Sequence, residues 1–91
     1  MLFGLLSSAT IKGTIYDQKT KEPLIGASVF IEDKGIGAAS DVDGSFILQN
    51  VRSCSTCTYV LKSTYIGYKT LTKSIDLFKN EDIILDLFLE S

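Results

Sequence analysis

Residues 40–48, "SDVDGSFIL", place two aspartates and a glycine directly before an alternating apolar run. Asp-x-Asp-Gly is either the opening of a calcium-binding loop or a tight turn between two strands. A helix-loop-helix calcium loop requires a bidentate glutamate at its twelfth residue, but that position, counted from Asp41, is Arg52. Asp43-Gly44 suits a hairpin turn, because both residue types tolerate positive φ, and Asp41 can accept hydrogen bonds from backbone amides across it. We therefore predict a structural turn at Asp41, Asp43 and Gly44, and no metal site.

The segments on both sides of this turn are short alternating runs separated by turn residues, with no stretch of helical period. Residues 37–40, 58–66 and 68–76 are expected strands, and the last two form an antiparallel pair around Gly67. Ile11, Gly13 and Ile15 share one face of an expected strand, Ala27, Val29 and Ile31 share one face of the next, and Phe46 and Leu48 alternate beyond the turn. In residues 58–66, one face carries Tyr59, Leu61, Ser63 and Tyr65, and the opposite face carries Val60, Lys62, Thr64 and Ile66.

The last strand has the clearest pattern. Its apolar face carries Ile83, Leu85, Leu87 and Leu89, and its polar face carries Asp82, Asp86 and Glu90. Ile84 and Phe88 are apolar residues on the polar side, which suggests that a loop or a partner covers them. About seven strands at this spacing call for two sheets packed face to face. The predicted fold class is all-β, a seven-stranded antiparallel β-sandwich.

Length and composition limit what the chain can do. The 91 residues fit one domain. Nine Lys and Arg against 11 Asp and Glu give a net charge of −2 without a long run of one sign, so no basic face for nucleic acid is expected. The absence of histidine removes the Ser-His and Cys-His nucleophile pairs and imidazole zinc sites. We expect no catalytic residue, no cofactor and no nucleic-acid partner.

Residues 1–9, "MLFGLLSSA", differ from the rest of the chain. An apolar stretch followed by small residues is typical of the end of a secretory signal, although the positive n-region is missing. Six apolar positions are far fewer than the roughly 20 that a membrane-spanning helix needs. The alternative is an ordinary first strand or a disordered tail. We expect an exported protein with a leader at residues 1–9 and a domain at residues 10–91.

Cys54-Ser-Thr-Cys57 is the other segment with reactive side chains. A thioredoxin-type CxxC places its first cysteine at a helix N-terminus, whereas this one runs into "TYVLKSTY", which is rich in strand-forming residues. A zinc site would need histidine or a second cysteine pair. In an exported chain, we expect a local disulfide between Cys54 and Cys57.

Tyr65-Ile66-Gly67-Tyr68 has a glycine between two aromatic residues. It is either an aromatic platform for sugar or peptide, or a core tyrosine followed by a glycine bend and a second, solvated tyrosine. The second interpretation is favoured, because no cluster of convergent polar groups lies nearby in the sequence. Tyr65 and Tyr68 remain a candidate contact surface.

Taken together, "GTIYDQKTKEPLIGASVFIEDKGIGAASDVDGSFIL" at residues 13–48 and "STYIGYKT" at residues 63–70 resemble the carboxypeptidase-regulatory-like domain. The resemblance covers residues 11 to 90. The matching positions are Gly13, Asp17, Pro23, Leu24, Gly26, Ala27, Val29, Ser40, Asp41, Asp43, Gly44, Phe46, Tyr65, Ile66, Gly67 and Tyr68. It implies a transthyretin-like sandwich without catalytic residues. One departure from the family pattern is the loop "RSCSTC" at residues 52–57, where a short turn usually stands.

The resemblance also implies a function, because this domain commonly forms the first periplasmic module of TonB-dependent outer-membrane transporters of Bacteroidota. We expect a non-enzymatic accessory domain on the periplasmic side of the outer membrane, which contacts the plug and barrel of its own chain or periplasmic proteins. One alternative is an extracellular adhesive module of the pilin-repeat type, with Lys12 and Asp86 covalently bonded, although Lys12 falls on the polar face. Another is a carbohydrate-binding module acting through Tyr65 and Tyr68. Exposed sheet edges could also pair two copies.

Overall fold

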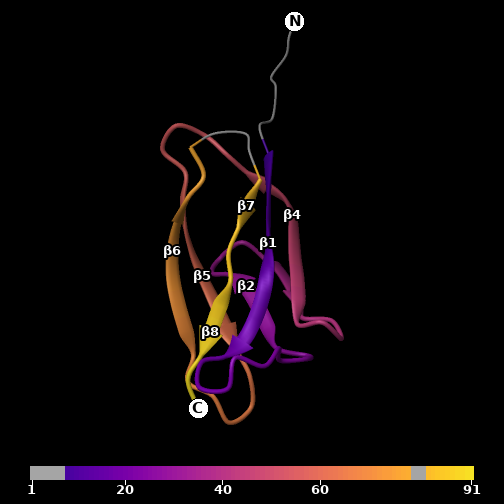
Figure 1. Ribbon diagram of the computed structural model, residues 1–91. Helices are drawn as coiled ribbons and strands as arrows, with labels where there is room; N and C mark the ends of the chain where they lie inside the picture. The colour runs from indigo at the N-terminus through magenta and orange to yellow at the C-terminus, as the bar shows by residue number, and fades with distance from the viewer. Residues whose placement is uncertain (1–7, 79–81) are drawn as a thin grey trace, which may run out of the picture.

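The computed structural model describes residues 8–78 and 82–91, which form two β-sheets packed face to face (Figure 1). The strands in this part of the chain are β1 (Ser8–Asp17), β2 (Ser28–Ile31), β3 (Ile36–Ala39), β4 (Ser45–Arg52), β5 (Thr58–Thr64), β6 (Leu71–Asp76), β7 (Ile83–Ile84) and β8 (Leu87–Leu89). The first sheet has the order β4-β1-β7, with β8 also paired to β1, and the second has the order β3-β2-β5-β6. The predicted all-β sandwich is confirmed.

The strand count and one pairing direction differ from the prediction. The expected single last strand is divided into β7 and β8, which gives eight strands in the described part of the chain. Both pieces run parallel to β1, with Lys12 paired to Ile84 and Ile15 to Leu87. The wholly antiparallel arrangement is therefore wrong for this pair, because alternation fixes which face is apolar but not the direction of the neighbouring strand.

Gly13, on β1, lies opposite the break between β7 and β8. A Cβ atom at this position would stand 1.6 Å from the carbonyl oxygen of Leu85, and the amide of Leu85 donates to the Lys12 carbonyl at 2.7 Å. The backbone of the last strand therefore occupies the space that a side chain at position 13 would need. Gly13 was predicted only as one member of an apolar face.

The core lies between the two sheets and follows the predicted alternation. Its buried apolar residues are Ala9, Ile11, Ile15, Leu24, Ala27, Val29, Ile31, Phe46, Leu48, Val51, Tyr59, Leu61, Ile75, Leu77, Leu87 and Leu89. Ser63, which alternation places on one face with Tyr59 and Leu61, is buried and donates a hydrogen bond to the Ser28 carbonyl at 3.0 Å. The expected strands at 58–66 and 68–76 are shorter than predicted, because residues 65–70 belong to the connection around Gly67.

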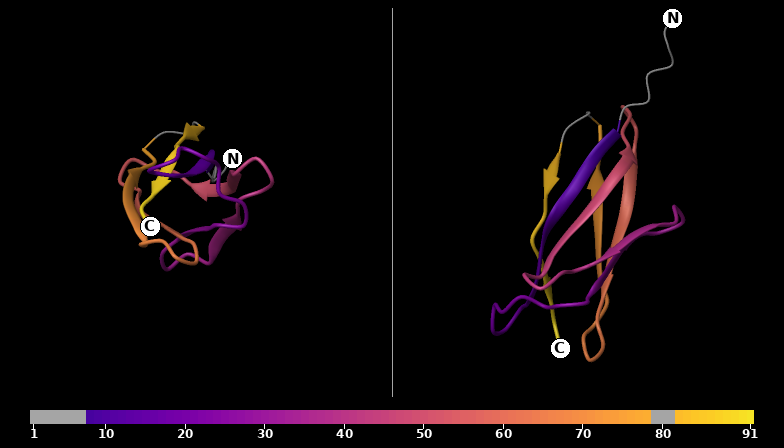
Figure 2. Two further views of the ribbon diagram at one scale, coloured as in Figure 1. Left: turned by 60° about the horizontal axis from the view of Figure 1, so that its bottom comes forward. Right: turned by 90° about the vertical axis from the view of Figure 1, so that its right-hand side faces the viewer.

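The sandwich has two ends that are built differently (Figures 1 and 2). One end, here called the motif end, contains the connections at residues 18–27, 40–44 and 65–70 together with the C-terminus. The other, here called the disulfide end, contains the loop at residues 53–57 and the start of β1.

Residues 1–7 of the expected leader lie outside the described residues. Ser8 and Ala9, the other two residues assigned to it, belong to β1, where Ala9 is buried and paired with Val51. Within residues 8–78 and 82–91, no helix is long and apolar enough to cross a membrane.

Candidate contact surfaces

The connection between β3 and β4 is a turn organised by one carboxylate. Asp41 Oδ1 accepts hydrogen bonds from the amides of Asp43 and Ser45, both at 2.9 Å. Gly44 has a φ of +77°, while Asp43 does not adopt a left-handed backbone. Since the Asp41 oxygen that faces the turn is occupied by two amides, this carboxylate is engaged by the backbone rather than directed at a ligand.

Ser40 and Gly44 connect this turn to the preceding "EPLIG" segment. The buried Ser40 hydroxyl accepts a hydrogen bond from the Ala27 amide at 2.9 Å and donates one to the Leu24 carbonyl. A Cβ atom at Gly44 would approach the Pro23 Cβ to 2.7 Å. Two sequence blocks that lie more than a dozen residues apart are thus packed into one unit at the motif end.

Asp17 and Tyr68 connect two further turns of the motif end. Asp17 Oδ1 accepts from the amides of Lys19 and Thr20 at 2.7 and 2.9 Å, and its Oδ2 accepts a short hydrogen bond from the Tyr68 hydroxyl. The Tyr68 hydroxyl, followed by the Thr20 amide, lowers the pKa of Asp17 below its ordinary value of 3.8. The same contact raises the pKa of Tyr68 above 10.0, because losing its proton would place a second negative charge beside the carboxylate.

Tyr65 and Tyr68 lie side by side, with ring centroids 5.6 Å apart and planes tilted by 41°. They border an open hollow of about 490 Å³, which is lined by Gly26, Ser28, Thr64, Tyr65, Ile66, Tyr68 and Thr70. The Tyr68 hydroxyl is already engaged by Asp17. The Tyr68 hydroxyl is therefore committed to the turn, while the other hydroxyl-bearing side chains that line the hollow are Ser28, Thr64, Tyr65 and Thr70.

Apolar side chains are exposed in three turns of the motif end. Ile25 is 55% exposed, Val42 78% and Ile66 95%. Ile66 precedes Gly67, whose φ of +88° forms the bend between β5 and β6. More than half of each of these side chains is left uncovered within the described domain and is available to a partner.

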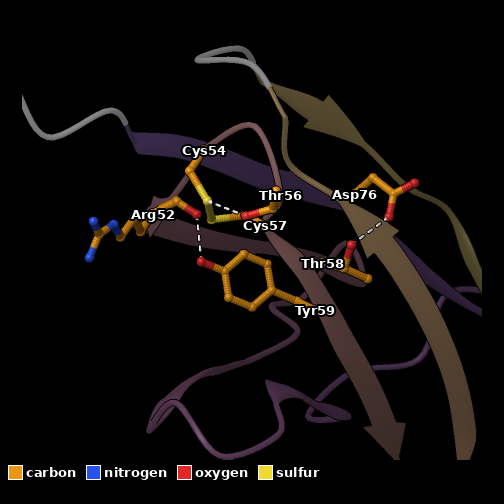
Figure 3. The surroundings of a disulfide bond; sticks show 7 residues. All are labelled: Arg52, Cys54, Thr56, Cys57, Thr58, Tyr59 and Asp76. Carbon is orange, nitrogen blue, oxygen red and sulfur yellow. Dashed lines mark hydrogen bonds between the residues drawn. A yellow bond between two sulfur atoms is a disulfide. The ribbon is translucent and has the colours of Figure 1, made fainter.

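At the disulfide end, Cys54 and Cys57 are joined by a disulfide with their Cα atoms 5.1 Å apart (Figure 3). The Cys54 amide donates to the Leu77 carbonyl at 3.0 Å, and the Leu77 amide donates to the Cys57 carbonyl at 2.9 Å. The loop is thus tied to the segment that follows β6. Cys54 follows a strand rather than opening a helix, so the helix dipole that activates a thioredoxin-type cysteine is missing.

Side chains next to the disulfide complete this end of the sandwich (Figure 3). The Tyr59 hydroxyl donates to the Arg52 carbonyl, and the Thr58 hydroxyl donates to Asp76 Oδ1 at 3.0 Å. Within the described residues, the buried Ser53 hydroxyl has no hydrogen-bond partner. The Thr58–Asp76 contact joins residues 18 positions apart, so together with the backbone bonds to Leu77 it links β5 and the segment after β6 at this end.

A third surface is the outer face of the first sheet, where a hollow of about 400 Å³ lies across β1, β4 and the last strand. Its lining includes Lys12, Ile47, Ile84 and Asp86. The alternation pattern indicated Ile84 as an exception, but it did not indicate that Ile47 and Lys12 lie beside it. Strand pairing is what brings these residues together, and it cannot be obtained from single-strand periodicity.

Metal binding has no donor set in the part of the chain that is described. Residues 8–78 and 82–91 contain no group of three or more His, Cys, Asp or Glu side chains placed to hold an ion.

The comparisons with known proteins agree with this geometry. The model of the CarboxypepD_reg-like domain family matches residues 11–91. Among curated proteins, none matches the sequence. A chain of a type II cohesin–X-dockerin complex of Acetivibrio cellulolyticus, carrying an interface mutation, superposes with a TM-score of 0.68 at 21% identity over 89% of this chain and 56% of that chain.

Two other solved structures share the architecture. Catechol 1,2-dioxygenase from Acinetobacter sp. ADP1 gives a TM-score of 0.69 at 11% identity, covering 93% of this chain and 53% of its own. The shaft pilin of Lactobacillus rhamnosus GG gives 0.64 at 17% identity, covering 91% and 47%. This chain therefore spans about half the length of each of these structures. At such identities the likeness shows the fold alone, since one fold carries many functions.

Two packed sheets, with motif residues that hold turns, define a small β-sandwich module. Within that class the match over residues 11–91 shows the family. The chain belongs to the CarboxypepD_reg-like domain family, as the motif blocks predict.

Proposed function

We propose that this domain is a non-enzymatic accessory module of a TonB-dependent outer-membrane nutrient transporter. It works on the periplasmic side through contacts with the plug and barrel of its own chain or with periplasmic proteins. The observation that carries the proposal is that residues of the family motifs hold turns together by hydrogen bonds. Asp17, Ser40 and Asp41 are engaged in backbone and turn hydrogen bonds, so the motif end offers apolar contact surface rather than reactive groups.

The leader-like "MLFGLLSSA" supports export, and the CarboxypepD_reg-like match supports the transporter setting over a cytosolic one. Ser91 lies at the motif end (Figure 1). In a longer chain, the next domain would be tethered beside the exposed Ile25, Val42 and Ile66. Contacts between these side chains and the plug would bury them.

The gene sequence beyond Ser91 tests the transporter setting directly. The expected continuation is a short linker, a plug domain, and then many segments of about ten residues that alternate apolar and polar positions. A string of similar sandwich repeats, or a downstream domain with zinc-ligand spacing, would contradict the proposal.

Protease accessibility tests the location in the native organism. The full chain is expected in the outer-membrane fraction, with this domain protected in intact cells and cleaved once the outer membrane is opened. Cleavage in intact cells would place the domain outside the cell and support an adhesive module instead. A protease-sensitive tag on a known periplasmic protein is the control, because it should be cleaved only after the outer membrane is opened.

One specific observation favours the adhesive alternative: Lys12 and Asp86 line the same hollow. An amide bond between them would release one water molecule. If the two side chains are not bonded, the intact mass should equal the sequence mass less only the two hydrogens lost in the disulfide. A further loss of about 18 Da, the mass of one water molecule, would favour the alternative.

A further inference from the structure

The outer face of the first sheet carries a patterned set of exposed residues, here called the β1 face: Lys12, Ile47, Ile84, Asp86 and Phe88. Lys12 is paired with Ile47 on β4 and with Ile84 on β7, so the three side chains form one row across the sheet. Ile84 is 71% exposed, Ile47 47% and Phe88 40%. Figure 1 views the molecule from this side.

The register places the other two residues on the same grid. The pairings of Lys12 with Ile84 and Tyr16 with Phe88 share one register, so Asp86 lies level with Thr14 and Phe88 level with Tyr16. Strands stand about 4.8 Å apart and every second residue advances about 6.6 Å. Asp86 is therefore diagonal to Lys12, about 8 Å away along the face.

We propose that a second copy of this domain packs on the β1 face, related by a two-fold axis that lies in the interface. The axis that brings Lys12 of one copy opposite Asp86 of the other also brings Ile84 close to Ile84 of the second copy. The same operation places Ile47 near Phe88 of the second copy. One symmetry operation thus satisfies two ion pairs and three apolar contacts, which is the self-complementarity that an isologous dimer requires.

The Phe88 ring is fixed in place by two neighbouring side chains. It stacks on Tyr16 with centroids 5.1 Å apart and planes inclined by 18°, and the Lys21 amine lies 4.9 Å from its centroid. An aromatic side chain fixed in this way loses little conformational entropy when a partner covers it. The hollow beside Lys12 leaves room for side chains of the facing copy.

The area indicates a weak dimer. Three strands and about five residues along each give a face of roughly 15 by 17 Å, or on the order of 250 Å² per copy. Stable interfaces bury about 800 Å² per partner, and smaller ones are transient. We expect a dissociation constant of about 0.1 to 1 mM, so the dimer forms only at high local concentration. The inference does not rest on the proposed function.

Charge reversal tests the symmetry. Lys12→Glu places two carboxylates at each former ion pair, and Asp86→Lys places two ammonium groups there. Each variant alone should dimerise at least about tenfold more weakly than the wild type, since two exposed pairs become two repulsions. An equimolar mixture of the two variants restores both attractions in the heterodimer, so association should return. The double variant K12E/D86K should also associate like the wild type.

Sedimentation equilibrium and concentration-dependent amide shifts, measured on the 91-residue chain up to about 2 mM, give the readout. Thermal unfolding of each variant confirms that the fold is kept. Ile66→Asp is the matched control, because it charges the most exposed of the large apolar side chains away from the β1 face and should leave association unchanged.

The outcomes separate this dimer from the other ways of pairing. Absence of self-association up to about 2 mM would overturn the proposal. If both charge-reversal variants associate as strongly as the wild type, and the amide shifts occur at β3 and β6, the copies pair through sheet edges instead of the β1 face. A mixture that stays monomeric would exclude the two-fold arrangement.

Discussion

The two ends of the sandwich close the same core by different means. At the motif end, side chains from separate segments meet: Ser40 bonds to Leu24 and Ala27, and Asp17 bonds to Tyr68. At the disulfide end, a covalent ring of neighbouring residues is tied to Leu77, just after β6, by backbone hydrogen bonds. Both ends join segments that are distant in sequence, but the motif end does so through side chains, whereas the disulfide end does so largely through backbone amides and carbonyls that a substitution leaves in place. Single substitutions should therefore cost more free energy of unfolding at the motif end.

Gly44→Val should have the largest effect. Its φ of +77° is strained for a β-branched residue, and a Cβ would stand 2.7 Å from Pro23 and 3.0 Å from the Ile15 carbonyl oxygen. We expect a loss of about 3 kcal/mol or more, from left-handed strain plus the displaced neighbours. Urea unfolding followed by circular dichroism measures it.

Gly35→Val separates strain from crowding in that result. Gly35 also has a positive φ, +66°, but nothing lies within 4 Å of its Cβ position. This variant should lose only the conformational part, about 1 to 2 kcal/mol. Equal losses at both positions would show that the contact with Pro23 contributes nothing.

Ser40→Ala tests the second connection of the motif end. Removing a buried hydroxyl leaves the Leu24 carbonyl and the Ala27 amide without their partner. Unpaired buried groups cost about 1 to 3 kcal/mol, so we expect about 2 kcal/mol in the same unfolding experiment. Ser74→Ala, at an exposed position of β6, is the control and should change little. A loss at Ser40 no larger than at Ser74 would contradict the role of the bridge.

The sequence predicts the parts of this architecture that depend on local pattern. Alternation identified most of the buried positions, such as Leu48 and Leu87, and turn chemistry located Gly44. It did not predict that the last strand runs parallel to β1, nor that the Leu85 backbone excludes a side chain at Gly13. Those features depend on which strands are neighbours, and alternation within one strand carries no information on that.

The contact surfaces also divide into one that local sequence indicates and one that depends on which strands are neighbours. Tyr65 and Tyr68 could be identified as a pair because they are close in sequence. Lys12 and Ile47 could not be combined with Ile84, because only the register of three strands places them in one row. A surface made by pairing becomes visible only when the sheet order is known.

Replacing both Cys54 and Cys57 by serine tests the disulfide end. A ring closed over so few residues restricts the unfolded chain only slightly, so the double variant should lose about 2 kcal/mol or less. The backbone bonds to Leu77 remain and hold the loop in place. Thermal unfolding with and without reducing agent gives the measurement, and the serine variant should not respond to the reductant. Failure of this variant to fold would reverse the ranking of the two ends.

The pair of Asp17 and Tyr68 should give the smallest effect, visible as a pH dependence. The folded carboxylate has a pKa below 3.8, so below about that pH the unfolded chain binds more protons and stability falls as the pH is lowered. The pKa of Tyr68 lies above 10.0 in the folded protein, so its contribution is present below that pH and is lost as the pH rises through the raised value. Tyr68→Phe removes the largest cause of the Asp17 shift together with the titrating Tyr68 hydroxyl itself, and should flatten both limbs of the profile of thermal midpoint against pH. Tyr65→Phe is the matched control, because among the described hydrogen bonds the hydroxyl that reaches Asp17 is that of Tyr68. If both variants keep the acid limb of the wild type, this contact does not couple the two turns, and the motif end is held by Ser40 and Gly44 instead.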